Sequence, residues 1–240
     1  MATAQDSLYL KKEFVYKGDT LLYRVLFPDN YNHDLTYPLV VFLHGSGECG
    51  NDNSKQLSHG GALFSNPQNR KKYPAIVIFP QCPSNDAWIN IKDKDKGTFE
   101  FVDKKEPTKS LLLTKKLIDF YKKTEAVDNK RIYISGISLG GMGTYDLICR
   151  YPDFFAAAVP ICGAVNVDRL KKVHKTAISI YHGGSDPIVS VEYARTAYNK
   201  LKANDTKIVQ FFEFPGIGHD CWDTIFAQPD FIKWIFIQKK

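Results

Sequence analysis

The stretch RIYISGISLGG, residues 131–141, decides the fold. It begins with an apolar run rich in β-branched and aromatic residues, which is typical of a buried strand. A helical pattern follows from Met142 to Tyr151 and ends at Pro152, because proline cannot continue a helix. The central GISLG matches G-x-S-x-G, in which a serine lies on a sharp turn between a strand and a helix. We therefore expect Ser138 to present its hydroxyl on such a turn; the alternative is a glycine-rich turn whose serine only caps the helix.

Strand and helix signals alternate on both sides of this stretch. Apolar runs predict strands over 21–27, 39–43, 75–79, 131–135, 155–161, 177–181 and 208–214, and apolar residues at helical spacing predict helices over 109–123, 142–151, 191–203 and 222–238. Short strands joined through helices need crossover connections, so the sheet should be mostly parallel and covered on both faces. The sequence thus predicts one doubly wound α/β domain over residues 1–240, with its core at about 20–238. About fifteen residues, 163–177, separate two of the strands, which leaves no room for a large lid.

Charge and composition exclude several classes of function. The chain has 240 residues, 44% of them hydrophobic, and a formal charge of +6. Most of the positive charge is lysine in scattered doublets, whereas proteins that read nucleic acid usually cluster arginine, so we expect no nucleic-acid partner. No apolar run approaches the roughly 18 residues of a membrane span, so no membrane partner is expected. The five cysteines form no C-x-x-C pair, and we expect neither a metal nor another cofactor.

The amino terminus leaves the compartment open. Residues 1–7, MATAQDS, lack the charged and apolar regions of a secretory signal. Two interpretations remain, a mature secreted or periplasmic protein and a cytoplasmic one.

A serine hydroxyl needs a base to take its proton, and the base needs a carboxylate to orient it. Where G-x-S-x-G carries the nucleophile, the chain order is serine, acid, histidine. Three histidines follow Ser138, at positions 174, 182 and 219. His182 comes before the loop that supplies the acid, and is therefore too early. His219 lies in a glycine-rich loop between the last strand and the last helix, so we expect it to be the base; the alternative is a loop histidine bonded to backbone.

The acid should follow the strand at 177–181. Asp186 lies there, in HGGSDP at 182–187. Other carboxylates after Ser138 are more simply explained as solvated, and Glu192 is the neighbour that could replace Asp186.

The oxyanion of an acyl-transfer intermediate needs two backbone donors. One should be the N–H of Leu139, which follows the serine. The other should come from HGSGE at 44–48, where glycines let the backbone approach. Ser46 is the first choice, with Gly45 and Gly47 as alternatives; a tight turn without chemistry is the remaining interpretation.

A thiol nucleophile must also be weighed, because Cys162 ends a predicted strand near the expected site. It lacks an activating loop and has no better base than Ser138, so a packed core thiol is preferred.

These motifs together resemble the α/β-hydrolase superfamily. More narrowly, they are similar to the lidless esterases that include feruloyl and acetylxylan esterases and polyhydroxybutyrate-depolymerase-like proteins. The likeness is carried by HGSGE at 44–48, PQCP at 80–83, Trp88, GISLG at 136–140, HGGSD at 182–186 and GH at 218–219. It implies an α/β-hydrolase fold and a serine carboxylesterase acting on feruloyl or acetyl esters attached to plant polysaccharide. It also implies that substrate passes near Gln81 and Trp88, although Trp88 could equally be a half-buried loop anchor.

Two other functions stay open. The same triad serves serine peptidases and thioesterases, and a protein of this fold can also bind a ligand without turnover. An uncapped serine suits a bulky ester, such as an acyl group on a polysaccharide, which favours the esterase. The charged segment 92–107 is predicted to form either a hairpin bordering the cleft or an exposed insertion.

Overall fold

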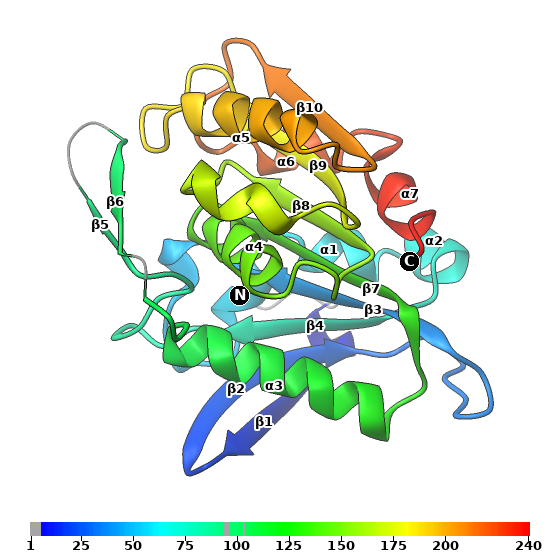
Figure 1. Ribbon diagram of the computed structural model, residues 1–240. Coiled ribbons are helices and arrows are strands. Elements are labelled where there is room, and N and C mark those ends of the chain that lie inside the picture. The colour runs from blue at the N-terminus through cyan, green and yellow to red at the C-terminus, as the bar shows by residue number, and fades with distance from the viewer. Residues whose placement is uncertain (1–5, 94–96, 103) are drawn as a thin grey trace.

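An eight-stranded sheet forms the centre of the molecule in the computed structural model, which describes residues 6–93, 97–102 and 104–240 (Figure 1). The strand order is β1-β2-β4-β3-β7-β8-β9-β10. β2 pairs antiparallel with β1 and with β4, and the strands from β4 to β10 are parallel to their neighbours. The strands are β1 Leu10–Tyr16, β2 Asp19–Leu26, β3 Tyr37–Leu43, β4 Ile76–Gln81, β7 Val127–Ile137, β8 Ala157–Ile161, β9 Ala177–Gly183 and β10 Val209–Phe214. The predicted doubly wound, mostly parallel α/β fold is confirmed.

Helices cover both faces of this sheet (Figure 1). One face carries α3 Lys109–Thr124, α4 Leu139–Arg150 and α5 Glu192–Ala203, and the other carries α1 Gly61–Ser65, α2 Pro67–Lys72, α6 Trp222–Phe226 and α7 Phe231–Phe236. Short 3-10 turns add η1 Asp6–Leu8, η2 Ser46–Glu48, η3 Lys55–Leu57 and η4 Val167–Lys172. Only η4 lies between β8 and β9, where a lid would be inserted. None of the helices in the described part of the chain is both long and apolar enough to cross a membrane.

Strand β3 shows why the strands read as continuous apolar runs. Leu39 and Val41 belong to the core under α3, α4 and α5, while Val40 and Phe42 belong to the core under α1, α6 and α7. Successive side chains of a strand point to opposite faces, so a strand covered on both sides needs apolar residues at every position. Each such side chain contributes about 1.5–3 kcal/mol when fully buried. The two cores fix β3, and with it the loop that follows.

The last predicted helix, 222–238, is wrong as a single element. The structure has two short helices there, α6 and α7, with Pro229 between them. Proline lacks a backbone N–H and its ring clashes with the preceding turn, so it interrupts the helix.

The segment at 92–107 contains a hairpin of β5 Ile91–Asp93 and β6 Phe99–Phe101. The rings of Phe99 and Phe101 pack against Tyr193 of α5, with ring centroids 6.0 Å and 5.9 Å away. The Ser190 N–H donates to the Gly97 carbonyl at 3.2 Å. The described part of this segment is therefore a hairpin packed against the start of α5; positions 94–96 and 103 lie outside the described residues.

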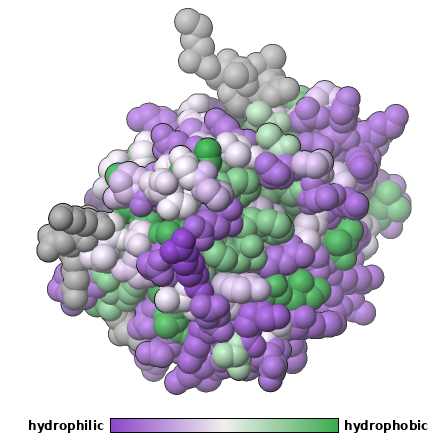
Figure 2. Space-filling model, turned by 90° about the horizontal axis from the view of Figure 1, so that it is seen from above, coloured by the Kyte–Doolittle hydropathy of each residue, from purple (hydrophilic) through white to green (hydrophobic). Residues whose placement is uncertain are grey.

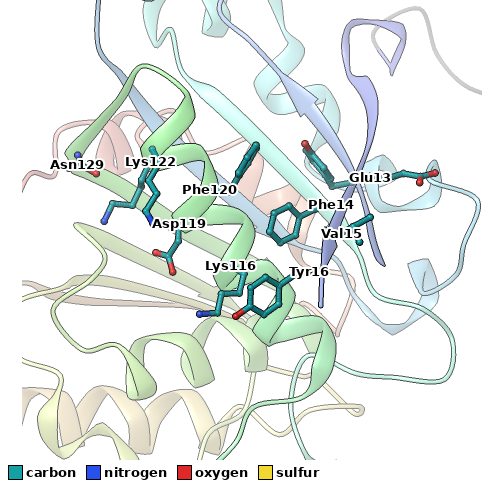
Figure 3. A pocket seen from close by; sticks show the side chains of 11 residues that line it. Glu13, Phe14, Val15, Tyr16, Lys116, Asp119, Phe120, Lys122 and Asn129 are labelled. Carbon is teal, nitrogen blue, oxygen red and sulfur yellow. The ribbon is translucent and has the colours of Figure 1, made fainter. Parts of the chain in front are cut away.

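The face of the molecule seen in Figure 2 is mainly hydrophilic, with hydrophobic residues gathered near its centre. A groove of about 910 Å³ lies between β1 and α3, and Phe14 and Phe120 are among its lining residues (Figure 3). A second hollow, of about 480 Å³, lies between β10 and α7, beside Phe212 and Trp234. Neither hollow is lined by Ser138 or by the loop at 44–48.

Candidate active site

Ser138 lies on the turn between β7 and α4 with a φ of +52° and a ψ of −118°. Positive φ is costly for a residue with a side chain and occurs where the surroundings enforce it. The side chain makes no capping hydrogen bond to α4, so Ser138 is not simply a helix cap. A Cβ on Gly136 would lie 2.4 Å from the Gly140 carbonyl oxygen, and one on Gly140 would lie 2.0 Å from that of Leu43. Only glycine fits at either position.

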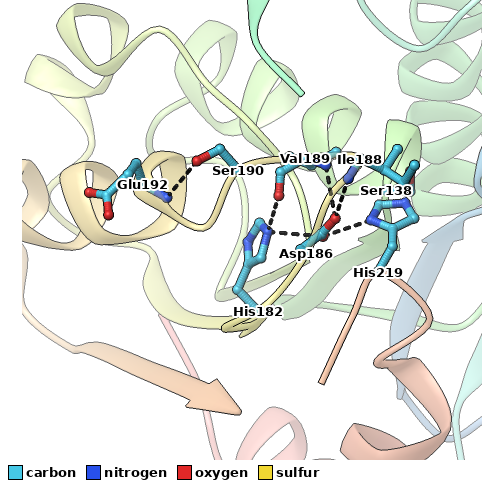
Figure 4. A network of polar contacts seen from close by, with 8 residues as sticks. All are labelled: Ser138, His182, Asp186, Ile188, Val189, Ser190, Glu192 and His219. Carbon is cyan, nitrogen blue, oxygen red and sulfur yellow. Dashed lines mark hydrogen bonds and ion pairs between the residues drawn. The ribbon is translucent and has the colours of Figure 1, made fainter. Parts of the chain in front are cut away.

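Ser138, His219 and Asp186 are joined by two hydrogen bonds (Figure 4). The His219 ring lies between the other two side chains, with Nε2 2.9 Å from Ser138 Oγ and Nδ1 2.7 Å from Asp186 Oδ2. The three residues follow β7, β10 and β9, whose carboxyl ends lie at the same edge of a parallel sheet. The structure therefore brings together the three residues that the sequence singled out. Glu192 is not part of this chain of contacts, because its carboxylate pairs with Arg195.

The Asp186 carboxylate is fully buried and accepts several hydrogen bonds. Its Oδ1 accepts from the N–H groups of Ile188 at 2.8 Å and Val189 at 2.9 Å. Burial alone would raise the pKa of Asp186, but hydrogen bonds from His182, His219 and Val189 outweigh it and hold this pKa well below its usual range. Asp186 is therefore charged at neutral pH and can stabilise a positive charge on His219.

His44 fixes the start of the loop at 44–48. The Cys82 N–H donates to His44 Nε2 at 2.9 Å, so the ring proton must be on Nδ1, which donates to the Gly45 carbonyl at 2.6 Å. Burial lowers the pKa of His44 to about 4, so the ring is neutral at pH 7. The Trp88 Nε1–H donates to the His44 carbonyl at 3.0 Å. No separate role was predicted for His44 from the sequence.

Gln81 and Trp88 do not lie where the family resemblance implies. Both are buried, with exposed fractions of 1% and 0%, so neither offers surface to a substrate. Gln81 Oε1 accepts from the Asn53 N–H at 2.7 Å, and its Nε2 donates to the Glu48 carbonyl at 3.2 Å. Both side chains instead hold the loop at 44–53. The contacts of Trp88 agree with the alternative interpretation, in which it anchors a loop. An amide at the end of the apolar strand β4 was the available sign of a buried hydrogen-bonding role.

The loop at 44–48 lies next to Ser138. A Cβ on Gly45 would be 3.7 Å from Ser138 Cβ. Ser46 begins η2 and Leu139 begins α4, and the first N–H groups of a helix have no carbonyl within the helix to bond. Both are therefore suited to accept an oxyanion, and their role stays a prediction.

Cys162 is fully buried at the end of β8. Burial raises the pKa of its thiol, which keeps the sulfur protonated and weakly nucleophilic. This favours a packed core thiol over a nucleophile.

Three further side chains form a wall beside His219. Trp222 stands edge-on to His219, with ring centroids 5.9 Å apart, and contacts His59 at 4.8 Å. His59 Nε2 lies 3.7 Å from a carboxylate oxygen of Glu48. These three side chains were not predicted from the sequence; the position of Trp222, three residues after His219, was the available signal. Across the described ranges, no group of three or more His, Cys, Asp and Glu side chains is placed to hold a metal ion.

Comparisons with known proteins show the family to which this chain belongs. A model of the family described as phospholipase/carboxylesterase matches residues 32–235. The chain is 28% identical over 214 residues to poly(3-hydroxyalkanoate) depolymerase C of Paucimonas lemoignei, a match that covers 80% of this chain and 49% of that protein. It is 25% identical over 205 residues to probable feruloyl esterase C of Aspergillus oryzae, with 85% and 69% covered. The chain thus spans about half the length of the first relative and about two thirds of the second.

Solved structures show the same fold. The crystal structure of a thermostable esterase superimposes with a TM-score of 0.86 at 33% identity, covering 98% of this chain and 64% of that one. A ferulic acid esterase from Anaeromyces mucronatus, solved with ferulic acid, gives a TM-score of 0.69 at 16% identity, covering 96% and 90%. At the lower identity the likeness concerns the fold alone.

Proposed function

Because the chain belongs to the phospholipase/carboxylesterase family of α/β-hydrolases, we propose that Ser138, His219 and Asp186 are the catalytic triad of a carboxylesterase. The observation that carries this proposal is the single imidazole of His219, hydrogen-bonded through one nitrogen to Ser138 and through the other to Asp186. A receptor that only binds a ligand would have no need of this arrangement.

The geometry supports an acyl-enzyme mechanism. Ser138 Oγ attacks the ester carbonyl while its proton passes to His219 Nε2, and the charge of Asp186 stabilises the imidazolium that forms. His219 then protonates the leaving alcohol, which leaves the acyl group on Ser138. In the second half, His219 takes a proton from water, the hydroxide attacks the acyl carbonyl, and the acid departs as Ser138 recovers its proton.

Two backbone groups complete the site. The N–H of Leu139 and that of Ser46 would hold the oxyanion of each tetrahedral intermediate. One such donor is typically worth about 3–4 kcal/mol of transition-state stabilisation. Hydrogen bonds of three buried side chains hold the loop that supplies Ser46; the side chains are those of His44, Gln81 and Trp88.

We propose feruloyl or acetyl esters attached to plant polysaccharide as the substrates. The probable feruloyl esterase C of Aspergillus oryzae supports this choice, as does an acetylxylan esterase/xylanase of Neocallimastix patriciarum, 34% identical over 86 residues that cover 35% of this chain and 13% of that protein. The connection between β8 and β9 holds only η4 and leaves no room there for a cap, which suits an ester on a bulky chain. A polysaccharide substrate would place the enzyme outside the cytoplasm.

Kinetics of Ser138→Ala on a substrate panel test both parts of the proposal. We expect kcat to fall about 10⁴-fold or more on methyl ferulate, acetylated xylan and p-nitrophenyl acetate, because the nucleophile is gone. Ser84→Ala, at an exposed turn, is the matched control and should keep full activity. If Ser138→Ala retained most of its activity, the nucleophile would be misassigned. Faster hydrolysis of a peptide p-nitroanilide than of every ester would instead favour a peptidase.

A further inference from the structure

His182 lies at the carboxyl end of β9, four residues before Asp186, and its side chain is fully buried. Its Nε2 lies 2.9 Å from the Val189 carbonyl oxygen and 3.2 Å from Asp186 Oδ2 (Figure 4). The chain order of the triad excluded His182 as the base, and the mechanism above gives it no part. A second imidazole nevertheless contacts the proposed catalytic acid.

We propose that His182 is a positioning residue that holds the Asp186 carboxylate in the orientation that His219 requires. The inference rests on the proposed function of the triad. It assigns to His182 an action through Asp186, with no contact to the substrate.

The contacts of the ring show which nitrogen donates. The Val189 carbonyl can only accept, so Nε2 must carry a proton, which it shares between that carbonyl and Asp186 Oδ2. Nδ1 is buried and has no hydrogen-bond partner among the described residues. A protonated Nδ1 would be a buried donor with no acceptor, whereas a bare nitrogen costs less. His182 therefore donates from Nε2.

This donor completes the set around Asp186. Oδ1 accepts from two backbone N–H groups, and Oδ2 accepts from His219 and His182. With both oxygens held, the carboxylate cannot rotate about its last bond without losing hydrogen bonds. Without His182, Oδ2 would be held by His219 alone, so the imidazole would lose part of its alignment with Ser138.

Loss of this donor also changes the charge that His219 meets. A carboxylate oxygen that accepts fewer hydrogen bonds keeps more of its negative charge available, and it attracts a protonated His219 more strongly. The other titratable groups nearby are the thiols of Cys162 and Cys221, the ion pair of Glu213 with Arg195, and His59 and Glu48 on the Trp222 side of His219. All of them are unchanged in a His182 variant, so a shift in the pH profile would report on the contact with Asp186.

The test compares His182→Phe, which keeps a flat ring without a donor, with His182→Gln, which keeps an N–H donor of similar reach. For His182→Phe we expect kcat to fall about 10- to 100-fold, the range known for hydrogen-bonding partners that orient metal-ligating side chains. KM should stay near the parent value, and the acid limb of the kcat/KM profile should move to higher pH. His182→Gln should restore most of kcat and the parent pH profile.

Two controls separate the possible failures. Ser138→Ala measured in the same ester assay tests the proposed function; if it stays active, the triad itself is misassigned. His174→Phe changes an exposed histidine whose ring bonds the Asn204 carbonyl, and it should leave both kcat and the pH profile unchanged. If Ser138→Ala is inactive but His182→Phe has the same kinetics as the parent protein, the positioning role is overturned. It is equally overturned if the Phe and Gln variants lose the same activity with an unshifted acid limb, since that is the result of a purely structural role.

Discussion

The backbone of Ser138 is the most constrained feature of the site at the scale of single residues. Its positive φ costs about 1–3 kcal/mol and must be enforced by the surroundings. Enforcement comes from close backbone contacts, since Gly140 lies where any Cβ would meet the carbonyl oxygens of Leu43 at 2.0 Å and His44 at 2.6 Å. Strand β3 and the turn that bears Ser138 are thereby held against each other.

Gly140→Ala should destabilise the protein strongly, because the atoms in the way are backbone and cannot move aside. We expect a loss of about 3 kcal/mol or more in the free energy of unfolding, measured by urea denaturation, together with loss of esterase activity. Gly47→Ala is the control, because a Cβ there meets nothing within 4 Å; its stability should change by less than about 0.5 kcal/mol. Equal stability of the two variants would contradict this account of the turn.

Single residues were predictable from sequence where their role depends on chain order. The G-x-S-x-G motif and the chain order of serine, acid and histidine predicted Ser138, Asp186 and His219. The structure brings their side chains together. The prediction that substrate passes near Gln81 was wrong, because burial of an amide depends on partners distant in the chain, here Asn53 and Glu48. The contact of His182 with Asp186 likewise depends on the path of the loop after β9.

At the scale of elements, the end of β4 supports the loop that follows β3. The two strands are parallel neighbours, so their carboxyl ends lie together. At this edge the Cys82 N–H donates to His44 Nε2. The ring must be neutral, because a protonated Nε2 could not accept this hydrogen bond. The loop at 44–48 is thus held by a hydrogen bond that protonation of His44 would break.

Stability should therefore fall at mildly acidic pH through His44. Its pKa is about 4 in the folded chain and about 6.5 when unfolded, so the unfolded state binds the proton more tightly. The contribution of the neutral ring is complete above about pH 6.5 and is lost progressively towards about pH 4, by an amount of the order of 3 kcal/mol. Urea unfolding at about pH 7 and pH 4.5 measures this loss. His44→Gln should lose less stability between the two; an equal loss in the parent and the variant would contradict the assignment.

Elements were predictable where burial dominates. The central strands and α3, α4 and α5 were found because their apolar pattern reflects packing on the sheet. Strand β1 was missed because it is an edge strand whose first residues, including Lys11, Lys12 and Glu13, are exposed. Its pairing with β2, and not its own composition, makes it a strand.

At the scale of the whole molecule, the strand order gathers the site. β7, β8, β9 and β10 are consecutive neighbours, and the loops after β7, β9 and β10 bear Ser138, Asp186 and His219. Alternating strands and helices predicted a doubly wound sheet. They could not predict that β4 is inserted between β2 and β3, because that pairing joins segments far apart in the chain.

Labelling of the intact protein with a fluorophosphonate, followed by peptide mapping, tests the central claim most directly. Such a probe reacts with a serine whose hydroxyl is activated by a neighbouring base. We expect stoichiometric modification of Ser138, a parallel loss of ester hydrolysis, and little labelling of His219→Ala. An unlabelled Ser138, or full ester hydrolysis by a chain fully labelled at Ser138, would contradict the account.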